Sequence, residues 1–251
     1  MNRTRSAVSL AVVGVVAAAL PTLTGGHASA HPDRHLSTTT AGRTSPPPSA
    51  FGGRATNRYF PLEPGTVTVL RGHSDGQQFR ERTFVTHRTK MIQGVRTRVV
   101  RDITRRLDGS LSEKTLDWYA TDNTGRVWYF GEATGTYDRH EHLINHDGSW
   151  EAGVDGAAAG KIMPAHPHPS VGFRQEFLRG EAEDQAWIVQ NNARLTTPVG
   201  HFRHAVRDFE WSRLEPGVVS TKFYAPGVGL LLERDLTGGN EVFRLVSIHR
   251  R

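Results

Sequence analysis

From residue 57 onward the sequence is a succession of short alternating apolar and polar runs separated by turn-forming residues. Gln93 and Gly94 form one such turn, Asp108 and Gly109 form another, and residues 238–240 separate the last two runs. A period of two predicts strands, and these dipeptides predict tight turns. No window of ordinary length in this region has sustained 3.6-residue apolar spacing, so the sequence predicts an all-β domain.

The runs predict an antiparallel meander of about ten strands. Strands with such short connections close into a barrel or half-open barrel, with a sandwich as the other possibility. Within the turn at residues 122–125, Gly125 is expected to have a positive φ. The expected strands are residues 66–70, 79–87, 95–104, 111–120, 127–130, 173–177, 182–190, 205–211, 218–225, 230–234 and 242–248.

One long segment, residues 137–170, interrupts the alternation. It contains several glycines, the run of alanines at 157–159 and the Pro-His-Pro motifs near its end. Loops of this length inside a domain are often lids or binding segments. We therefore expect one long irregular loop here, and we look in it first for a functional site.

The first thirty residues resemble a cleaved export signal. Arg3 and Arg5 precede an apolar run at residues 7–20, and Ala28-Ser29-Ala30 matches the A-x-A cleavage pattern. The run is too short to span a bilayer. We therefore predict a signal peptide at 1–30, a secreted or extracellular location, and no stable membrane span.

The next segment, residues 31–56, is rich in Ser, Thr and Pro and poor in apolar side chains. Such a composition cannot bury enough apolar surface to offset its conformational entropy, so we expect a disordered leader. The folded domain is then predicted to cover residues 57–251. The chain has no cysteine, which means that burial must stabilise this domain without disulfides and that thiolate chemistry is excluded.

The charge distribution excludes one class of partner. The formal net charge is +6, and Lys and Arg are interspersed with acids along the chain rather than clustered. This pattern favours a solvated surface over a nucleic-acid footprint, so no nucleic-acid partner is expected.

Four carboxylates near aromatic residues are candidate catalytic groups: Asp117, Glu132, Glu151 and Glu176. Paired acids on an aromatic-lined surface suit glycoside hydrolysis, as acid and base or acid and nucleophile. They equally suit strands with Trp pointing inward and Asp or Glu pointing outward. Because neighbours on a strand point to opposite faces, Asp117 and Tyr119 should share one face and Trp118 the other.

A second candidate site is a concave aromatic face that binds an apolar or carbohydrate ligand. Its expected contacts are Trp118, Tyr119, Trp128, Trp150 and Glu151. Trp150, inside the long loop, is either a lid over this face or a plug at one end of the barrel.

Two further motifs carry little weight. His140, His142 and His146 are weak candidates for a divalent metal site, because their spacing fits no closed metal signature. We therefore expect no cofactor. The segment Gly72-His73-Ser74-Asp75-Gly76 matches G-x-S-x-G, but it leads into a strand instead of the helix that a hydrolase elbow requires. It is interpreted as a hairpin turn.

Several longer segments resemble a family of exported proteins. These segments are TLDWYATDNTGRVWYFGE (115–132), GSWEAGVDGAAAGKIMPAHP (148–167), FRQEF and GEAEDQAWIV (within 173–189), TTPVGHF (196–202) and LEPGVVSTKFYAPGVGLLLE (214–233). They are similar to a group of uncharacterised, actinobacterial-type exported β-rich proteins, over residues 57–248. More loosely, the C-terminal half resembles exported barrel and half-barrel domains that are similar to lipoprotein carriers. The resemblance implies no assigned catalytic residues, and it does not require the three histidines.

The favoured hypothesis is a secreted or envelope-associated binding protein, a monomer whose ligand is a small apolar molecule or a glycan. A secreted polysaccharide hydrolase or lyase that uses the four carboxylates is the alternative. A structural envelope protein is the third possibility.

Overall fold

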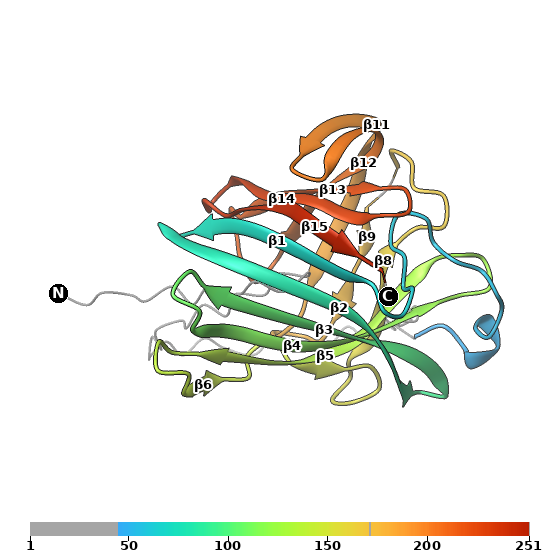
Figure 1. Ribbon diagram of the computed structural model, residues 1–251. Coiled ribbons are helices and arrows are strands. Elements are labelled where there is room, and N and C mark those ends of the chain that lie inside the picture. The colour runs from blue at the N-terminus through green and yellow to red at the C-terminus, as the bar shows by residue number, and fades with distance from the viewer. Residues whose placement is uncertain (1–44, 171, 251) are drawn as a thin grey trace, which may run out of the picture.

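The computed structural model describes residues 45–170 and 172–250, and nearly all of its regular structure is antiparallel sheet (Figure 1). A single 3₁₀ turn, η1 (Pro48–Ala50), precedes the strands. The strands are β1 (Val67–Ser74), β2 (Gln77–Ile92), β3 (Val95–Arg106), β4 (Leu111–Thr121), β5 (Val127–Tyr137), β6 (Leu143–Asn145), β7 (Trp150–Glu151), β8 (Ala158–Met163), β9 (Phe173–Arg174), β10 (Glu176–Phe177), β11 (Asp184–Thr197), β12 (Gly200–Ser212), β13 (Val219–Ala225), β14 (Gly229–Thr237) and β15 (Val242–His249).

The strands form one sheet that curls into a nearly closed barrel. Its order runs from β10 through β8, β5, β4, β3, β2 and β1 to β15, and then through β14, β13, β12 and β11 to β9. The two edges approach each other where β10 contacts β11 and β8 contacts β9. The backbone N–H of Gln175 also donates to the carbonyl of Asp184 across this junction, at 2.8 Å. The prediction of an all-β antiparallel barrel is confirmed, although the strands outnumber the ten that were expected.

The extra strands come in part from residues 137–170, where the sequence predicts irregular structure. This segment supplies β6, β7 and β8, which all pair with β5. The close approach of β7 needs glycine at position 131, because a Cβ there would lie 2.2 Å from the carbonyl oxygen of Trp150. Strands of two to six residues are too short to show a period, so the alternation could not reveal them.

The strand alternation separates the charged side chains by sign. In pairs such as Glu81 and Arg82, or Asp102 and Arg101, the acid is buried and the adjacent base is more exposed. Among the described residues twelve acidic side chains are buried, out of 25 in the whole sequence, whereas Lys222 is the only buried base. The charges that intermingle along the chain are therefore separated in the fold, with an acid-rich interior and a basic exterior.

Residues 45–56 differ from the expected disordered leader, because they lie against the barrel. The Phe51 ring packs edge-on against Phe130, with centroids 5.6 Å apart. The Ser45 hydroxyl accepts a hydrogen bond from the backbone N–H of Ala159 at 3.0 Å, and the Ala50 carbonyl accepts one from Asn123 at 2.7 Å. These contacts join the segment to β5, β8 and the β4–β5 turn, which a composition-based prediction cannot anticipate. The predicted signal peptide and the rest of the leader lie outside the described residues.

The chain then crosses one end of the barrel as a strap, residues 57–66, which is anchored by Asn57. The side-chain amide of this buried residue donates to the carbonyls of Gly125 and Pro164, at 2.8 and 2.9 Å. Its Oδ1 accepts from the backbone N–H groups of Tyr59 and Phe60. Gly125 itself has φ +91° and closes the turn from Asp122, so its predicted positive φ is confirmed.

Asn57→Ala is expected to lower the free energy of unfolding by about 2–3 kcal/mol, because it removes four hydrogen bonds, two to the carbonyls of Gly125 and Pro164 and two from backbone N–H groups of the strap. Urea denaturation measures the change. Asn191→Ala, at an exposed position on β11, is the matched control and should change stability by less than about 0.5 kcal/mol. Equal stabilities for the two variants would contradict the anchoring role of Asn57.

Candidate functional site

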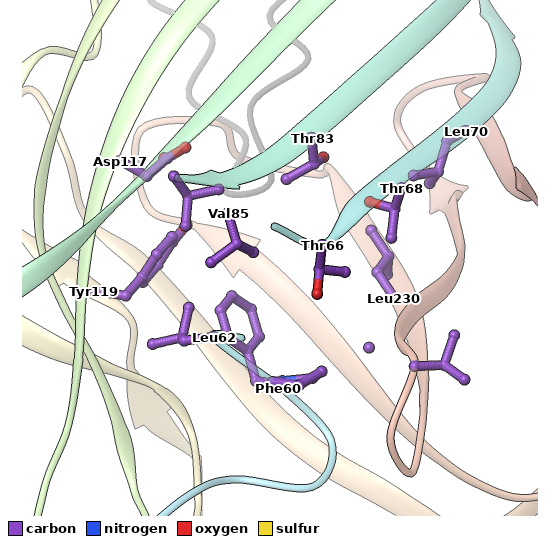
Figure 2. Close-up of a pocket in the computed structure, with 14 residues that line it drawn as sticks. Phe60, Leu62, Thr66, Thr68, Leu70, Thr83, Val85, Asp117, Tyr119 and Leu230 are labelled. Carbon is purple, nitrogen blue, oxygen red and sulfur yellow. The ribbon is translucent and has the colours of Figure 1, made fainter. Parts of the chain in front are cut away.

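A pocket with about 70 Å³ of free space lies at the end of the barrel that the strap covers (Figure 2). Side chains of β1, β2, β3 and β4 form one wall, and the β13–β14 turn and the strap form the rest. Most of this lining is apolar, and the polar groups are threonines, Tyr119 and one carboxylate, Asp117. The lining residues are Phe60, Pro61, Leu62, Thr66, Thr68, Leu70, Thr83, Val85, Val100, Asp117, Tyr119, Val228, Gly229 and Leu230.

The strap is held over the pocket by an aromatic contact and by main-chain hydrogen bonds. Phe60 packs edge-on against Tyr119, with centroids 5.1 Å apart, and it also contacts Tyr224 at 6.4 Å. The backbone N–H of Gly65 donates to the carbonyl of Val85, and that of Gly227 donates to Arg58. Figure 2 shows Phe60 and Leu62 of the strap close to Tyr119 and Val85. The pocket is therefore a covered site whose cover has few regular sheet contacts.

Asp117 is the carboxyl group of the pocket, and its surroundings change its chemistry. Its Oδ1 accepts a hydrogen bond from the Tyr129 hydroxyl at 2.8 Å, and the Tyr119 and Tyr129 rings stack with centroids 4.7 Å apart. Burial raises the pKa of Asp117 to about 8, and the nearby carboxylate of Asp102 adds to the increase. At neutral pH Asp117 is therefore mainly a protonated acid that can donate a hydrogen bond.

One hydroxyl group that lines the pocket, the Oγ1 of Thr66, is buried and has no hydrogen-bond partner within the described chain. The Tyr119 hydroxyl differs from it, because it hydrogen-bonds to Asp117 and partly offsets the rise in the pKa of that carboxyl group. An unmade hydrogen bond in a buried setting costs about 1–3 kcal/mol. A polar group placed between Thr66 and Asp117 would remove that cost.

The four predicted carboxylates fall into two groups. Asp117 and Glu132 are cross-strand partners on β4 and β5, and both are buried. Glu176, on β10, accepts a hydrogen bond from Trp150 Nε1 at 3.0 Å and is also buried. Glu151 lies apart from them in an ion pair with Lys90, at 2.7 Å. Asp117 is the one member of the set that lines the pocket.

Burial raises the pKa of both Glu132 and Glu176 well above the usual value. For Glu132 the next cause is the charge of Asp117, and for Glu176 it is that of Asp184. One oxygen of each, Oε2 of Glu132 and Oε1 of Glu176, has no hydrogen-bond partner within the described chain. The inner wall therefore carries several carboxyl groups whose pKa values are raised by burial.

The predicted aromatic contacts do not share one concave face. Tyr119 lines the pocket, whereas Trp118 lies on the opposite face of β4 with the Lys90 ammonium 3.4 Å from its ring centroid. Trp128 donates from Nε1 to Asp122 at 2.9 Å. Trp150 is 4% exposed and packs edge-on against Tyr129, with centroids 5.3 Å apart. Its position is that of a plug within the core rather than of a lid.

The predicted histidines are separated by their local contacts. The rings of His140 and His142 are 6.0 Å apart on an exposed turn, where His142 faces Asp138. His146 instead makes a hydrogen bond through Nδ1 to the carbonyl of Thr134, at 2.6 Å. In the described ranges, 45–170 and 172–250, no group of three His, Cys, Asp or Glu side chains is placed to hold a metal ion.

A buried ion cluster around Lys222 has no counterpart in the sequence-based predictions. The Lys222 ammonium lies 2.7 Å from Glu210 and 3.2 Å from Glu233, and its backbone N–H donates to Asp208 at 2.7 Å. Although burial lowers the pKa of Lys222, the two glutamates outweigh it and raise that pKa above the usual value. The alternation of residues 206–212 and 219–225 could have indicated that these charges face inward.

The strap residues of the pocket were also missed by sequence reasoning. Phe60, Pro61 and Leu62 form a short apolar run next to a segment that was assigned to the leader. The run has no alternation and no turn signal, and its place over the barrel depends on tertiary hydrogen bonds. The one available signal was this apolar cluster itself, because apolar residues next to a polar, Pro-rich segment indicate a part of the chain that packs against the folded domain.

Comparisons with known proteins show two similar solved structures. No family model and no curated protein matches the sequence. One structure is a "putative exported protein with YmcC-like fold" from Bacteroides fragilis, with a TM-score of 0.47 and 12% identity, covering 77% of this chain and 100% of that one. The other is a "putative lipoprotein" from Parabacteroides distasonis, with a TM-score of 0.42 and 13% identity, covering 78% and 100%.

The described residues contain no helix with the length and apolar character needed to cross a membrane.

Proposed function

We propose that this chain is an exported binding protein that holds a small amphiphilic molecule in the strap-covered pocket. The observation that supports this proposal is an apolar pocket that contains a buried carboxylic acid and a buried hydroxyl group, that of Thr66, without a partner within the described chain. The apolar part of the ligand would contact Leu62, Val85 and Leu230. Its polar group would hydrogen-bond to Asp117. Export is proposed from the predicted signal at residues 1–30.

The size and charge of the pocket narrow the class of ligand. Sites for drug-sized molecules usually enclose about 300–1,000 Å³. The 70 Å³ available here accommodates a short alkyl chain or a small ring, and a longer ligand would require the strap to move. A neutral group with an acceptor oxygen suits Asp117, because the protonated carboxyl group donates a hydrogen bond and an ionised ligand group would lose its hydration in the apolar pocket.

Catalysis by the four carboxylates is not part of this proposal. A glycosidase needs two carboxyl groups across a cleft, about 5–10 Å apart, with substrate access to both. Asp117 lines the pocket, but Glu132 and Glu176 do not, and Glu151 is paired with Lys90. We propose a monomeric protein whose folded domain begins by Ser45 and whose function is binding.

Thermal-shift measurements with hexanol, hexylamine and hexanoate at neutral pH test this function. A ligand at one hundred times its dissociation constant adds about 2.7 kcal/mol, which raises the melting temperature by several degrees. We expect hexanol to stabilise the protein, and the ionised hexylamine and hexanoate to have weaker effects.

Leu62→Trp should fill the pocket and abolish the stabilisation while preserving the fold. Leu107→Trp, at a side chain that is 77% exposed, is the matched control and should retain it. The proposal fails if none of the three molecules stabilises the parent protein, or if both tryptophan variants respond as the parent does.

A further inference from the structure

Four arginines form a row across four adjacent strands of the barrel exterior. Arg71 of β1 is the direct cross-strand partner of both Arg244 on β15 and Arg80 on β2. Arg80 is in turn the partner of Arg105 on β3. Directly opposed residues share a face of the sheet, and strands lie about 4.8 Å apart, so the row extends for about 15 Å. Figure 1 shows these strands side by side.

The row has almost no compensating negative charge. All four side chains are exposed, and within the described chain Arg71, Arg80 and Arg244 make no ion pair. Arg105 alone is paired, with Glu141 at 3.3 Å. Like charges directly opposite each other destabilise a sheet. Three successive Arg–Arg pairs therefore lower stability without an anion to neutralise them.

The acids that could neutralise these arginines face the other side of the same strands. Glu81 follows Arg80 and is buried, and Asp102 on β3 is also buried. Burial raises the pKa of Asp102 to about 6 and that of Glu81 well above its usual value, and both carboxyl groups face away from the arginine row. The outer face of β1, β2 and β3 consequently has a more positive potential than the net charge of the chain suggests.

A groove with about 710 Å³ of free space lies along the row. Its lining includes Arg71, Arg80 and Arg105, together with His73, Gln78 and Leu107 from the ends of the same strands. It is about ten times larger than the strap-covered pocket, and its Arg71 and Arg80 lie on the opposite face of β1 and β2 from Leu70 and Thr83, which line that pocket. The two features are therefore separate in both shape and charge.

We propose that the arginine row and its groove form a docking surface for a linear acidic polysaccharide. An extended chain with one anionic group per sugar presents charges at a regular spacing, comparable to the spacing of adjacent strands. Guanidinium groups bind carboxylates, sulfates and phosphates in a bidentate manner. The polar His73 and Gln78 can hydrogen-bond to sugar hydroxyls between the charged contacts.

The surroundings of the row favour a polysaccharide over a membrane or a nucleic acid. A membrane-binding surface combines cations with exposed apolar side chains, and the groove lining has only Leu107 of this kind exposed among the described residues. Single-stranded nucleic acids stack their bases on aromatic side chains. The aromatic ring in the lining, Phe79, is buried.

The test is binding of the folded protein to polygalacturonate, with neutral dextran as the blank. We expect Arg71→Gln/Arg80→Gln to weaken binding at least tenfold and Arg88→Gln/Arg96→Gln to weaken it less than threefold. The second pair removes the same charge from exposed positions of β2 and β3 outside the groove. Binding by the parent should weaken as salt is added.

Several results would overturn the proposal. One is an equal loss of affinity in the two double variants, which would indicate attraction by net charge alone. Another is the absence of binding by the parent. Binding to anionic phospholipid vesicles and to single-stranded DNA is measured in parallel. If Arg71→Gln/Arg80→Gln weakens binding to either of these more than binding to polygalacturonate, the surface is assigned to that partner instead. The row variants should also melt at the same or a higher temperature than the parent, which excludes misfolding as a cause.

Discussion

Replacing Lys222 with methionine is expected to lower the free energy of unfolding by about 3–5 kcal/mol. The Lys222 ammonium is fully buried and contacts both Glu210 and Glu233, at 2.7 and 3.2 Å. Methionine fills a similar volume, so the loss comes from leaving two buried carboxylates without their cation. Urea denaturation at pH 7 measures it.

A matched control and a rescue variant separate the charge effect from packing. Lys114→Met makes the same change at an exposed position on β4 and should alter stability by less than about 0.5 kcal/mol. Adding Glu210→Gln and Glu233→Gln to Lys222→Met should recover much of the loss, because it removes the uncompensated charges. A loss in the triple variant as large as in Lys222→Met alone would contradict this account of the cluster.

The barrel is expected to become less stable as the pH rises from 5 to 8, by on the order of 8 kcal/mol. Burial raises the pKa of Asp102 to about 6, that of Glu233 to about 7 and that of Asp117 to about 8. In the unfolded chain such groups titrate near pH 4. Between pH 4 and each raised value the folded state holds a proton that the unfolded state has lost. Stability is therefore highest near pH 4–5 and decreases with rising pH.

Urea denaturation at several pH values measures this dependence, and Asp117→Asn assigns part of it. The amide can still accept the hydrogen bond from Tyr129 but cannot ionise. Between pH 5 and 8 the free energy of unfolding of this variant should therefore fall by only about half as much as that of the parent. Each group with a raised pKa lowers stability by about 1.4 kcal/mol per pH unit until the pH reaches its pKa, and Asp117 has the highest of the three values. A parent protein that gains stability over this range would show that the inner carboxyl groups are ionised.

The class of fold could be predicted from the sequence because strand alternation and turn residues are local signals. Turn residues such as Gln93-Gly94 and Asp108-Gly109 marked hairpins of the barrel correctly. The short strands β6 to β8 could not be found in this way. They exist because β5 offers an edge to pair with, and because Gly131 allows the close approach of Trp150.

The direction in which each strand faces was harder to predict. Alternation places Asp117 and Trp118 on opposite faces but does not say which one is inside. The usual preference would bury Trp and expose Asp, whereas Asp117 faces the interior here and Trp118 is covered from outside by Lys90. Glu81 and Asp102 also face the interior although they are acidic. Which face of each strand points inward is therefore determined by the assembled sheet, and the sequence of a single strand does not specify it.

The pocket could be predicted only in part. Asp117 and Tyr119 were among the candidate residues, and both line it. Phe60 and Leu62 were not, because their position depends on Asn57 binding to Gly125 and Pro164, which lie far away in the sequence. Long-range hydrogen bonds of this kind have no periodic trace in the sequence.

The most direct test of the account is a carbon-13 NMR titration of the Asp117 side-chain carboxyl, assigned by comparison with Asp117→Asn. The proposed site requires this group to be a protonated acid inside the barrel at neutral pH. We predict a titration midpoint of about 8 in the folded protein. A midpoint near 4, the value of a solvated aspartate, would contradict both the acid-rich interior and the proposed hydrogen-bond donor of the pocket.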